Sequence, residues 1–271
     1  MTTSYTHTLV RTIRREEVDT FLRLLCDVFD LDFHHAKVVF TKEPFFDLER
    51  KWAIFFEGKM IGCLTTVPVQ FGDGRAIGIA GVAVREEYRG QGFGSELMRA
   101  VLRESDARGE GRALLFAQEP RFYEKHGFRV LDDVISGEII GMGNVEGNRV
   151  LPIQTVRKIY DAWASESPIR LRRDSRRWDF WSWSGKVPYE MGEDGYVCME
   201  GMRIRELLPK FQPFGSKKRI SLWNDEKRRE WYGLKTMVEK LEIPIGNYSV
   251  DLKLMGLGFN EVPEMFLSDQ F

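Results

Sequence analysis

The sequence predicts a mixed α/β protein of the α+β kind: a mostly antiparallel sheet flanked by helices, followed by a second, smaller α/β domain. Two observations point to this class. Strand-like and helix-like spacings alternate along the chain, and short turns join neighbouring strands as in antiparallel hairpins. A glycine-rich, weakly patterned stretch at 141–148 then separates two halves. With ~150 residues per domain as a guide, 271 residues suffice for two domains.

In the first half, residues 8–14 alternate apolar and polar side chains as a half-buried strand does. From Glu16 to Phe29 the apolar side chains recur at helical spacing. The residues after them predict a hairpin of strands 52–56 and 60–71 that turns at 57–59, a strand at 77–84, a helix from 93 to 109, a strand at 113–117, a short helix around 122–125 and two closing strands at 127–131 and 134–140.

The second half also reads as α/β and contains six of the seven tryptophans. A diverged copy of the first half is one interpretation of its order of elements. The expected elements are a helix at 153–163, a hairpin at 187–201 that turns at 192–195, strands at 202–208 and 219–223, and a helix at 225–241.

Charge and composition exclude several function classes. Forty basic and forty-one acidic residues leave a net charge of −1, which argues against nucleic-acid or anionic-membrane partners. No apolar run approaches the ~20 residues that a membrane span needs. Cys26, Cys63 and Cys198 are odd in number and lack metal-ligand spacing, so we expect reduced thiols, no metal site and a cytoplasmic protein.

The segment 89–94, Arg-Gly-Gln-Gly-Phe-Gly, leads from a strand directly into a helix. Such a turn leaves backbone N–H groups unpaired at the positive end of the helix dipole, and glycines let an anion approach the main chain. No Gly-Lys-Ser/Thr follows as in a Walker A loop, and the Rossmann Gly-x-Gly-x-x-Gly spacing is absent. We therefore predict an anion site, suited to a pyrophosphate, of another type.

Two motifs together resemble the GNAT superfamily of N-acetyltransferases. Arg89-x-x-Gly92-x-Gly94 after the strand at 82–84 is similar to the superfamily's acetyl-coenzyme A motif. Phe122-Tyr123, with Gly127-Phe128 after three further residues, is similar to its second motif. The resemblance covers roughly residues 8–140 and implies acetyl-CoA as cosubstrate, with no metal.

A finer resemblance is to the Eis-like (enhanced intracellular survival) aminoglycoside acetyltransferases, in which a degenerate GNAT-like domain follows the catalytic one. It implies a catalytic domain at 1–142 and a second domain at 150–271 that shapes the acceptor cavity. The oligomeric state, a homo-oligomer included, stays open.

By this resemblance, the strand at 82–84 pairs with the pantetheine arm and the loop holds the pyrophosphate. The expected cofactor-binding residues are Val82, Ala83, Val84, Arg89, Gly90, Gln91, Gly92, Phe93, Gly94, Ser95, Gln118 and Glu119.

Catalysis requires a proton donor for the leaving thiolate and a base for the incoming amine. The resemblance assigns the acid to Tyr123 and suggests the terminal carboxylate of Phe271 as the base; plain aromatic packing and an unused terminus are the alternatives. Asp30, Asp32 and the pair His34-His35 follow the first helix, where the superfamily builds acceptor contacts, although ordinary loop histidines would look the same.

A basic and aromatic segment at 170–183 has two interpretations. It could suggest nucleic acid, but in a neutral chain salt-bridged packing between domains fits better. The sequence thus predicts an N-acetyltransferase for a small-molecule primary amine, such as an aminoglycoside or a polyamine. The alternatives are a protein lysine or N-terminal acetyltransferase and, outside enzymes, an acyl-CoA-binding sensor.

Overall fold

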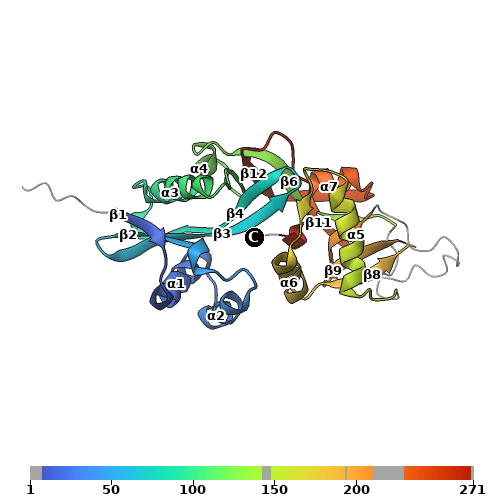
Figure 1. Cartoon of the computed structure of the whole chain (residues 1–271), viewed down its shortest axis with the longest axis horizontal. Coiled ribbons are helices and arrows are strands. Elements are labelled where there is room, and N and C mark those ends of the chain that lie inside the picture. Colours follow the sequence, from blue (N-terminus) through green and yellow to red (C-terminus); the bar gives the residue numbers. More distant parts are fainter. Residues whose placement is uncertain (1–7, 142–147, 193, 210–228, 270–271) are drawn as a thin grey trace, which may run out of the picture.

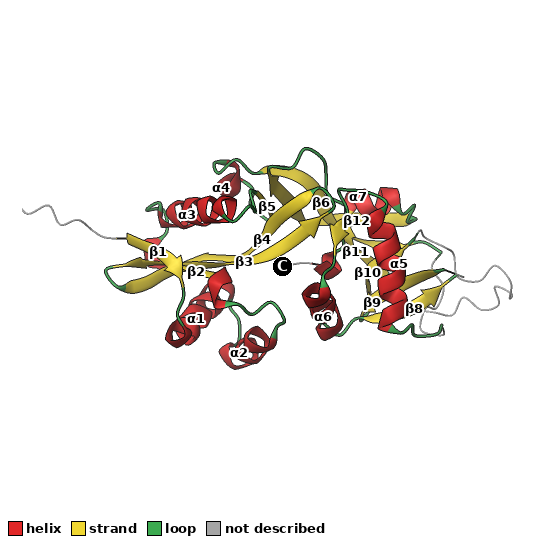
Figure 2. Ribbon diagram, viewed as in Figure 1, coloured by secondary structure: helices red, strands yellow, loops and turns green. Residues whose placement is uncertain are grey.

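The computed structural model describes residues 8–141, 148–192, 194–209 and 229–269. A single twisted sheet runs through the length of the molecule, with helices on both faces (Figures 1 and 2). Its strand order is β1-β2-β3-β4-β5-β12-β6-β11-β10-β9-β8, with β7 paired to β3. The mixed, mostly antiparallel sheet that the sequence predicts is confirmed.

In the first region the strands β1 to β4 are antiparallel neighbours, and β5 runs parallel to β4. Helix α3 covers one face of this part of the sheet, and α1 and α2 lie on the other (Figure 1). The elements are β1 (Thr8–Thr12), α1 (Val18–Phe29), α2 (Phe33–Lys42), β2 (Lys51–Phe56), β3 (Lys59–Phe71), β4 (Gly74–Val84), α3 (Phe93–Ala107), β5 (Arg112–Ala117), α4 (Arg121–Glu124) and β6 (Arg129–Ile139).

Strand β2 shows why both faces of the sheet need helices. All but the last of its residues are buried, and successive side chains point to opposite faces. Trp52 and Ile54 pack in the core beneath α3, whereas Ala53 and Phe55 pack with Phe21 of α1. A strand that is apolar on both faces must be covered twice.

The second region repeats part of this order. Strands β8, β9 and β10 are antiparallel neighbours and β11 runs parallel to β10, as β5 does to β4. Its elements are α5 (Ile153–Ser165), β7 (Leu171–Arg172), α6 (Ser175–Trp183), β8 (Val187–Met191), β9 (Gly195–Glu200), β10 (Arg203–Leu208), β11 (Glu230–Leu234), α7 (Lys235–Lys240), β12 (Ile245–Leu257) and the 3₁₀ turn η4 (Leu267–Asp269).

The two regions exchange strands at the centre of the sheet. Strand β12 lies between β5 and β6, with Leu254 opposite Phe116 of β5. Strand β6 in turn pairs with β11, where Ile135 lies opposite Gly233. Strand β12 of the second region therefore extends the sheet of the first, and β6 of the first region extends the sheet of the second. The strand pairing is continuous across both regions.

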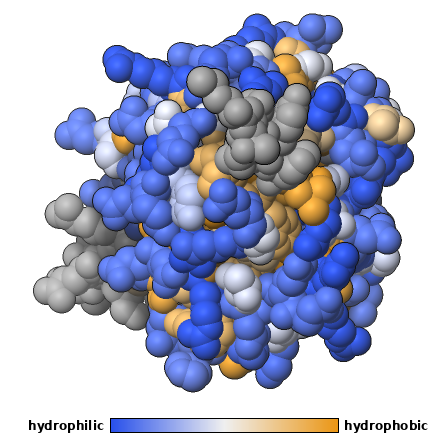
Figure 3. Space-filling view, turned by 90° about the vertical axis from the view of Figure 1, so that its left-hand side faces the viewer, coloured by the Kyte–Doolittle hydropathy of each residue, from blue (hydrophilic) through white to orange (hydrophobic). Residues whose placement is uncertain are grey.

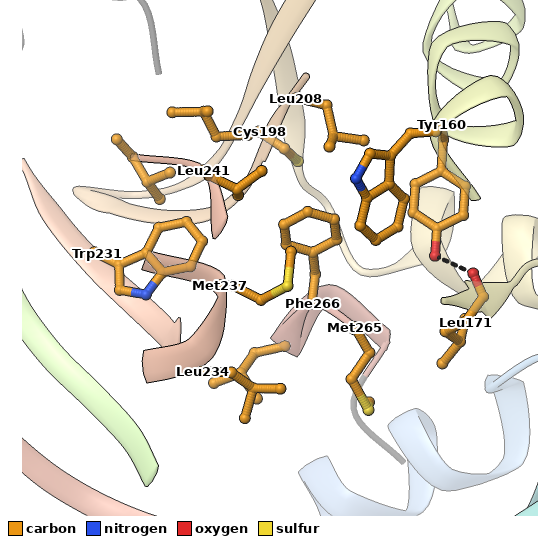
Figure 4. Close-up of a cluster of buried hydrophobic side chains, with 14 of the residues drawn as sticks. Tyr160, Leu171, Cys198, Leu208, Trp231, Leu234, Met237, Leu241, Met265 and Phe266 are labelled. Atoms are coloured by element: carbon orange, nitrogen blue, oxygen red, sulfur yellow. Dashed lines mark hydrogen bonds between the residues drawn. The ribbon is translucent and has the colours of Figure 1, made fainter. Parts of the chain in front are cut away.

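A large apolar core fills the second region (Figure 4) and continues into the first through Phe71 of β3 and Leu114 of β5. Trp231, Met237 and Phe266 are buried in it, and Tyr160 of α5 donates its hydroxyl to the carbonyl of Leu171 over 2.8 Å. The hydrogen bond satisfies the one polar atom of that side chain, which would otherwise be costly to bury.

Beside this core lies a fully buried ionic cluster. The guanidinium of Arg173 donates to both oxygens of Glu206 (3.0 and 2.6 Å) and both of Asp269 (2.7 and 2.8 Å). Tyr196 and Ser268 also donate to Glu206. Burial opposes ionisation of Glu206, but the charge and hydrogen bonds of Arg173 outweigh it and lower the pKa of the carboxyl. The cluster links η4 and β10 to the connection between β7 and α6.

Several predicted elements are corrected. Residues 129–139 form one strand, not two, because β12 and β11 together pair along its length. Where a helix was expected at 225–241, the described part is β11 followed by a short α7, and the strand expected at 219–223 lies outside the described residues. Helices α2 and α6 and the long strand β12 were not predicted.

Seen from the end that carries β1, the face is mostly hydrophilic, and an apolar patch lies near its middle (Figure 3). Within the described residues, no helix is both long and apolar enough to cross a membrane.

Candidate active site

Strands β4 and β5 part in the middle of the sheet. They pair from Ala76 opposite Arg112 to Ile79 opposite Leu115. Beyond Leu115, Phe116 and Ala117 of β5 pair with β12, which lies on the opposite edge of that strand. A bulge in β4 accompanies the parting, since Gly81 and Val82 together oppose a single residue of β3. Gly81 has φ +61°, a conformation that glycine adopts without a steric penalty. The end of β4 therefore has its β3 partner on one side and a gap on the other.

The glycine loop after β4 exposes its main chain. Gly90 and Gly92 have φ of +75° and +91°, and a Cβ built on either would meet nothing within 4 Å. Gly94 differs, because its Cβ would come within 3.3 Å of Phe122 and 3.4 Å of Val84. Gly90 and Gly92 allow the backbone to turn and leave the main chain open to a ligand, whereas Gly94 lets α3 pack closely on the sheet.

Side chains hold the two ends of the loop. Tyr88 and Phe93 contact each other and both contact Phe56 of β2, with ring centroids 5.3 to 6.1 Å apart. Arg89 donates its Nε to the Val84 carbonyl, and Gln91 donates its Nε2 to the Glu87 carbonyl, each over 3.0 Å. The loop is thus braced from inside while Gly90 to Gly92 face outward.

A cavity of about 370 Å³ lies over this loop. It is lined by Val84, Tyr88, Arg89, Gly90, Gly92, Phe93, Gly94, Ser95, Phe122 and Lys125. Unpaired N–H groups at the start of α3, the helix dipole and two cationic side chains give it the chemistry of an anion site. The residues present fit a diphosphate.

Tyr123 lies on α4, at the carboxyl end of β5. Its ring packs edge-on against Phe122 and Phe128, with centroids 5.0 and 6.2 Å away. Burial raises the pKa of the phenol above its ordinary value of 10. Among the residues that the structure describes, its hydroxyl has no hydrogen-bond partner. The phenol is therefore a protonated donor that no described neighbour uses.

With this geometry in view, comparison with known proteins is decisive for the first region. Residues 9–131 match the family model described as "Acetyltransferase (GNAT) domain". Residues 9–131 belong to the GNAT acetyltransferase family. The parted strands and the glycine loop both lie inside this GNAT domain. No curated protein matches the chain.

Solved structures share the fold over nearly the whole chain. A GCN5-related N-acetyltransferase from Kribbella flavida superposes with a TM-score of 0.69 at 18% identity, over 92% of this chain and 71% of that one. A second from Anabaena variabilis gives 0.68 at 17%, over 92% and 72%. Eis1 from Mycobacterium abscessus gives 0.57 at 15%, over 92% and 73%. The likeness extends past the GNAT domain into the second region.

The GNAT domain brings most of the predicted site residues together. Seven line the loop cavity: Val84, Arg89, Gly90, Gly92, Phe93, Gly94 and Ser95. Val82 lies in the bulge, Ala83 is buried on the α1 face, and Gln91 braces the loop. Gln118 and Glu119 are exposed just after β5, before Tyr123. Phe271 lies outside the described residues, which end at Asp269.

The residues suggested for acceptor contacts follow the first helix, as expected. His34 and His35 belong to the first turn of α2 and are not loop histidines. Asp32 caps that helix, since its carboxylate accepts the His35 N–H over 2.7 Å. Asp30 ends α1 in a left-handed conformation, with φ +53°. The positions of Asp30 and Asp32 are thus explained by the end of α1 and the start of α2.

Sequence reasoning missed three residues of the loop cavity. No role in binding was predicted for Tyr88, Phe122 or Lys125. Lys125, directly after the short helix of the second motif, was a usable signal, because cations at an anion site are expected. Tyr88 carried no such signal, since its place depends on packing with β2.

The basic and aromatic segment is part of the packing between the two regions. Arg177 donates to the Pro68 carbonyl of β3 and Arg176 to the Pro44 carbonyl after α2, over 2.8 and 2.6 Å. All three cysteines are free and buried. In the described ranges, no cluster of three or more His, Cys, Asp or Glu side chains could hold a metal ion.

Proposed function

We propose that the protein is an acetyl-CoA-dependent N-acetyltransferase that moves the acetyl group directly from the thioester to a primary amine of a small molecule, such as an aminoglycoside or a polyamine. The observation that carries the proposal is the gap between β4 and β5 beside the open glycine loop, with an unpartnered phenol nearby. Acetyl-CoA would supply the acetyl group in activated form, as a thioester.

The chain's own residues offer two kinds of binding. Along 82–84, β4 presents a strand edge on the side of the gap, to which an extended amide-bearing arm can add like another strand. At the start of α3, the backbone N–H groups and Arg89 offer donors and positive charge to a diphosphate. Both features lie on one continuous segment, so they can hold one extended ligand.

Tyr123 is the proposed general acid. A thiolate is a poor leaving group unless it is stabilised or protonated, and a phenol with a raised pKa is fully protonated at neutral pH. The proton moves from its hydroxyl to the departing sulfur as the bond from carbon to sulfur breaks. The amine nitrogen forms the new bond to the acetyl carbon and loses its own proton to a base. No acyl-enzyme is required.

The proposed base is the carboxylate of Phe271. Supporting it, the preceding residues Ser268 and Asp269 are buried and accept hydrogen bonds from Arg173. Extending the chain beyond Phe271 by a short peptide should then depress activity without changing CoA binding. Normal activity of the extended chain would remove Phe271 from the mechanism.

The second region is proposed to shape the acceptor cavity. Its helix α6 contacts the connection between α2 and β2, where Phe180 packs on Phe45 with ring centroids 5.5 Å apart. Helix α6 and the GNAT domain's α1 and α2 lie on the same side of the sheet (Figure 1). An acceptor that entered from this side would meet both regions.

Thiol release from acetyl-CoA with a panel of aminoglycosides, polyamines, lysine peptides and peptides with free N-termini tests the proposal. Turnover with small amines supports it. Turnover with peptides alone would favour a protein acetyltransferase. Calorimetric binding of CoA without turnover on any amine would instead favour the acyl-CoA sensor. Absence of CoA binding would contradict all three.

A further inference from the structure

A side chain of helix α1 lies over the inner end of the gap between β4 and β5. Ile79 is the last residue of β4 that pairs with β5, so Gly81 lies two positions beyond the point at which the strands part. A Cβ built on Gly81 would come within 3.1 Å of Cδ2 of Leu25 and 4.0 Å of its Cδ1. Leu25 therefore occupies, on the α1 face of the sheet, the space that a side chain at position 81 would need.

Leu25 differs from its neighbours on α1. Phe21 and Leu24 are fully buried in the core between α1 and the sheet, whereas Leu25 is half-buried and packs at the margin of that core. Part of its isobutyl group therefore remains accessible. A half-buried leucine beside a strand gap borders the opening without closing it, so a ligand that lies in the gap can contact this side chain.

The other directions around the inner end of the gap are closed. The ladder between β4 and β5 ends at Ile79 opposite Leu115, and both side chains are buried beneath α3. On the α3 face, Val82 and Tyr123 pack against the same core. The inner end of the gap thus has paired strands behind it, Val82 and Tyr123 on the α3 face and Leu25 on the α1 face.

We propose that Leu25 limits the length of the acyl group that the protein accepts, so that an acetyl group fits and a butyryl group does not. This inference rests on the proposed function, which places the diphosphate on the glycine loop and the extended arm along 82–84. An arm that runs from the loop back along β4 brings its thioester end to the bulge at Gly81. Acyl carbons beyond the second would then meet the methyl groups of Leu25, and displacing a packed side chain costs free energy.

Calorimetric titration of the full chain with coenzyme A, acetyl-CoA and butyryl-CoA tests the proposal without an acceptor amine. Wild type should bind butyryl-CoA about tenfold or more weakly than acetyl-CoA, the size expected when a pocket rejects extra methylene groups. Leu25→Ala removes most of the isobutyl group and should bring the two affinities within about twofold of each other. Leu25→Phe should act in the opposite direction and weaken acetyl-CoA relative to coenzyme A, which carries no acyl group.

Leu48→Ala is the matched control for Leu25→Ala. Leu48 is also a half-buried leucine at the margin of the core between α1 and the sheet. It belongs to the 3₁₀ turn η2 (Leu48–Arg50) before β2 and not to α1. Its truncation removes the same atoms from the same core, so Leu48→Ala should keep the wild-type preference for acetyl-CoA.

The remaining outcomes separate this inference from the proposed function. Equal binding of acetyl-CoA and butyryl-CoA by wild type overturns the role of Leu25 and leaves the proposed function intact. A preference that Leu25→Ala retains, or that Leu48→Ala loses as well, also overturns that role, because Leu25 would then not set the acyl length. Binding of none of the three ligands by wild type overturns the proposed function and this inference with it.

Discussion

Two pairs of parallel strands, β4 with β5 and β10 with β11, part after a few residues, and the space beyond them is used differently. In the first region the end of β4 adjoins the open loop cavity of about 370 Å³. In the second, β10 and β11 pair only at Arg203–Glu230 and Ile204–Trp231, and the turn η4 packs against both strands and against α6. There the buried side chains of Ser268 and Asp269 meet Arg173 and Glu206.

The difference teaches that parted strands alone do not make a ligand site. The segment after β4 has glycines at the turn and opens a helix, so main-chain donors point into the space. In the second region the space beyond the paired residues of β10 and β11 is filled by the buried ionic cluster. One opening is thus available for binding, while the other holds the sheet and the end of the described chain together.

The largest effect is expected in the second region. Arg173→Met should lower the free energy of unfolding by about 3–5 kcal/mol, because Glu206 and Asp269 would remain buried without their cation. Arg172→Met, the exposed neighbour, is the control and should change little. Denaturant titration measures both. Equal, small changes would mean that the cluster does not stabilise this part of the sheet.

In the first region, Tyr123→Phe should reduce turnover by at least about tenfold while leaving acetyl-CoA affinity nearly unchanged, as expected for loss of a general acid. Phe128→Leu is a packing control, since it removes an aromatic contact to Tyr123 but no proton donor and does not line the loop cavity. If Tyr123→Phe turns over normally, the phenol has a packing role alone.

The pH dependence of turnover also tests Tyr123 as the general acid. A general acid must be protonated, and burial raises the pKa of Tyr123, so its protonated form persists past pH 10. Turnover by wild type should therefore show no loss from this group through the neutral range and should fall only at more alkaline pH. Rate profiles of wild type and Tyr123→Phe, compared at saturating acetyl-CoA, test this. An alkaline fall that both share cannot be assigned to the phenol.

A smaller effect is expected from the glycine loop. Gly92→Ala places a Cβ at φ +91° and should cost about 1–2 kcal/mol of stability, with weaker CoA binding because the loop must shift. Gly58→Ala is the matched control: it has φ +78° and open space, but lies in the β2–β3 turn. Both variants should lose comparable stability, and only Gly92→Ala should lose affinity. If Gly92→Ala and Gly58→Ala bind CoA equally well, the glycine loop is not part of the CoA site.

The smallest effect on stability is expected for the partly exposed ion pair of Arg11 and Glu17, in contrast to the buried ionic cluster. Hydrogen bonds from Arg11 lower the pKa of Glu17 to about 2. A depressed folded-state pKa contributes stability above the unfolded value of 4.5, and the contribution is lost as pH falls toward 2. Wild type should therefore exceed Glu17→Gln by less than ~1 kcal/mol at pH 7, and the two should converge at acid pH.

The local chemistry of the site could be predicted from the sequence. A glycine's tolerance of positive φ, the helical spacing after Phe93 and the order of strand and turn signals are properties of neighbouring residues. The glycine loop, α3 and the place of Tyr123 after β5 were all predicted on this basis, and their positions are confirmed.

Contacts between distant residues could not be predicted in this way. The insertion of β12 between β5 and β6 pairs residues more than a hundred positions apart, and no local pattern names the partner of a strand edge. Salt-bridged packing was expected for the segment that contains Arg173, but no local pattern identifies Glu206 and Asp269 as its buried partners. Backbone preferences act along the chain, whereas burial and charge pairing depend on which parts of the chain pack together.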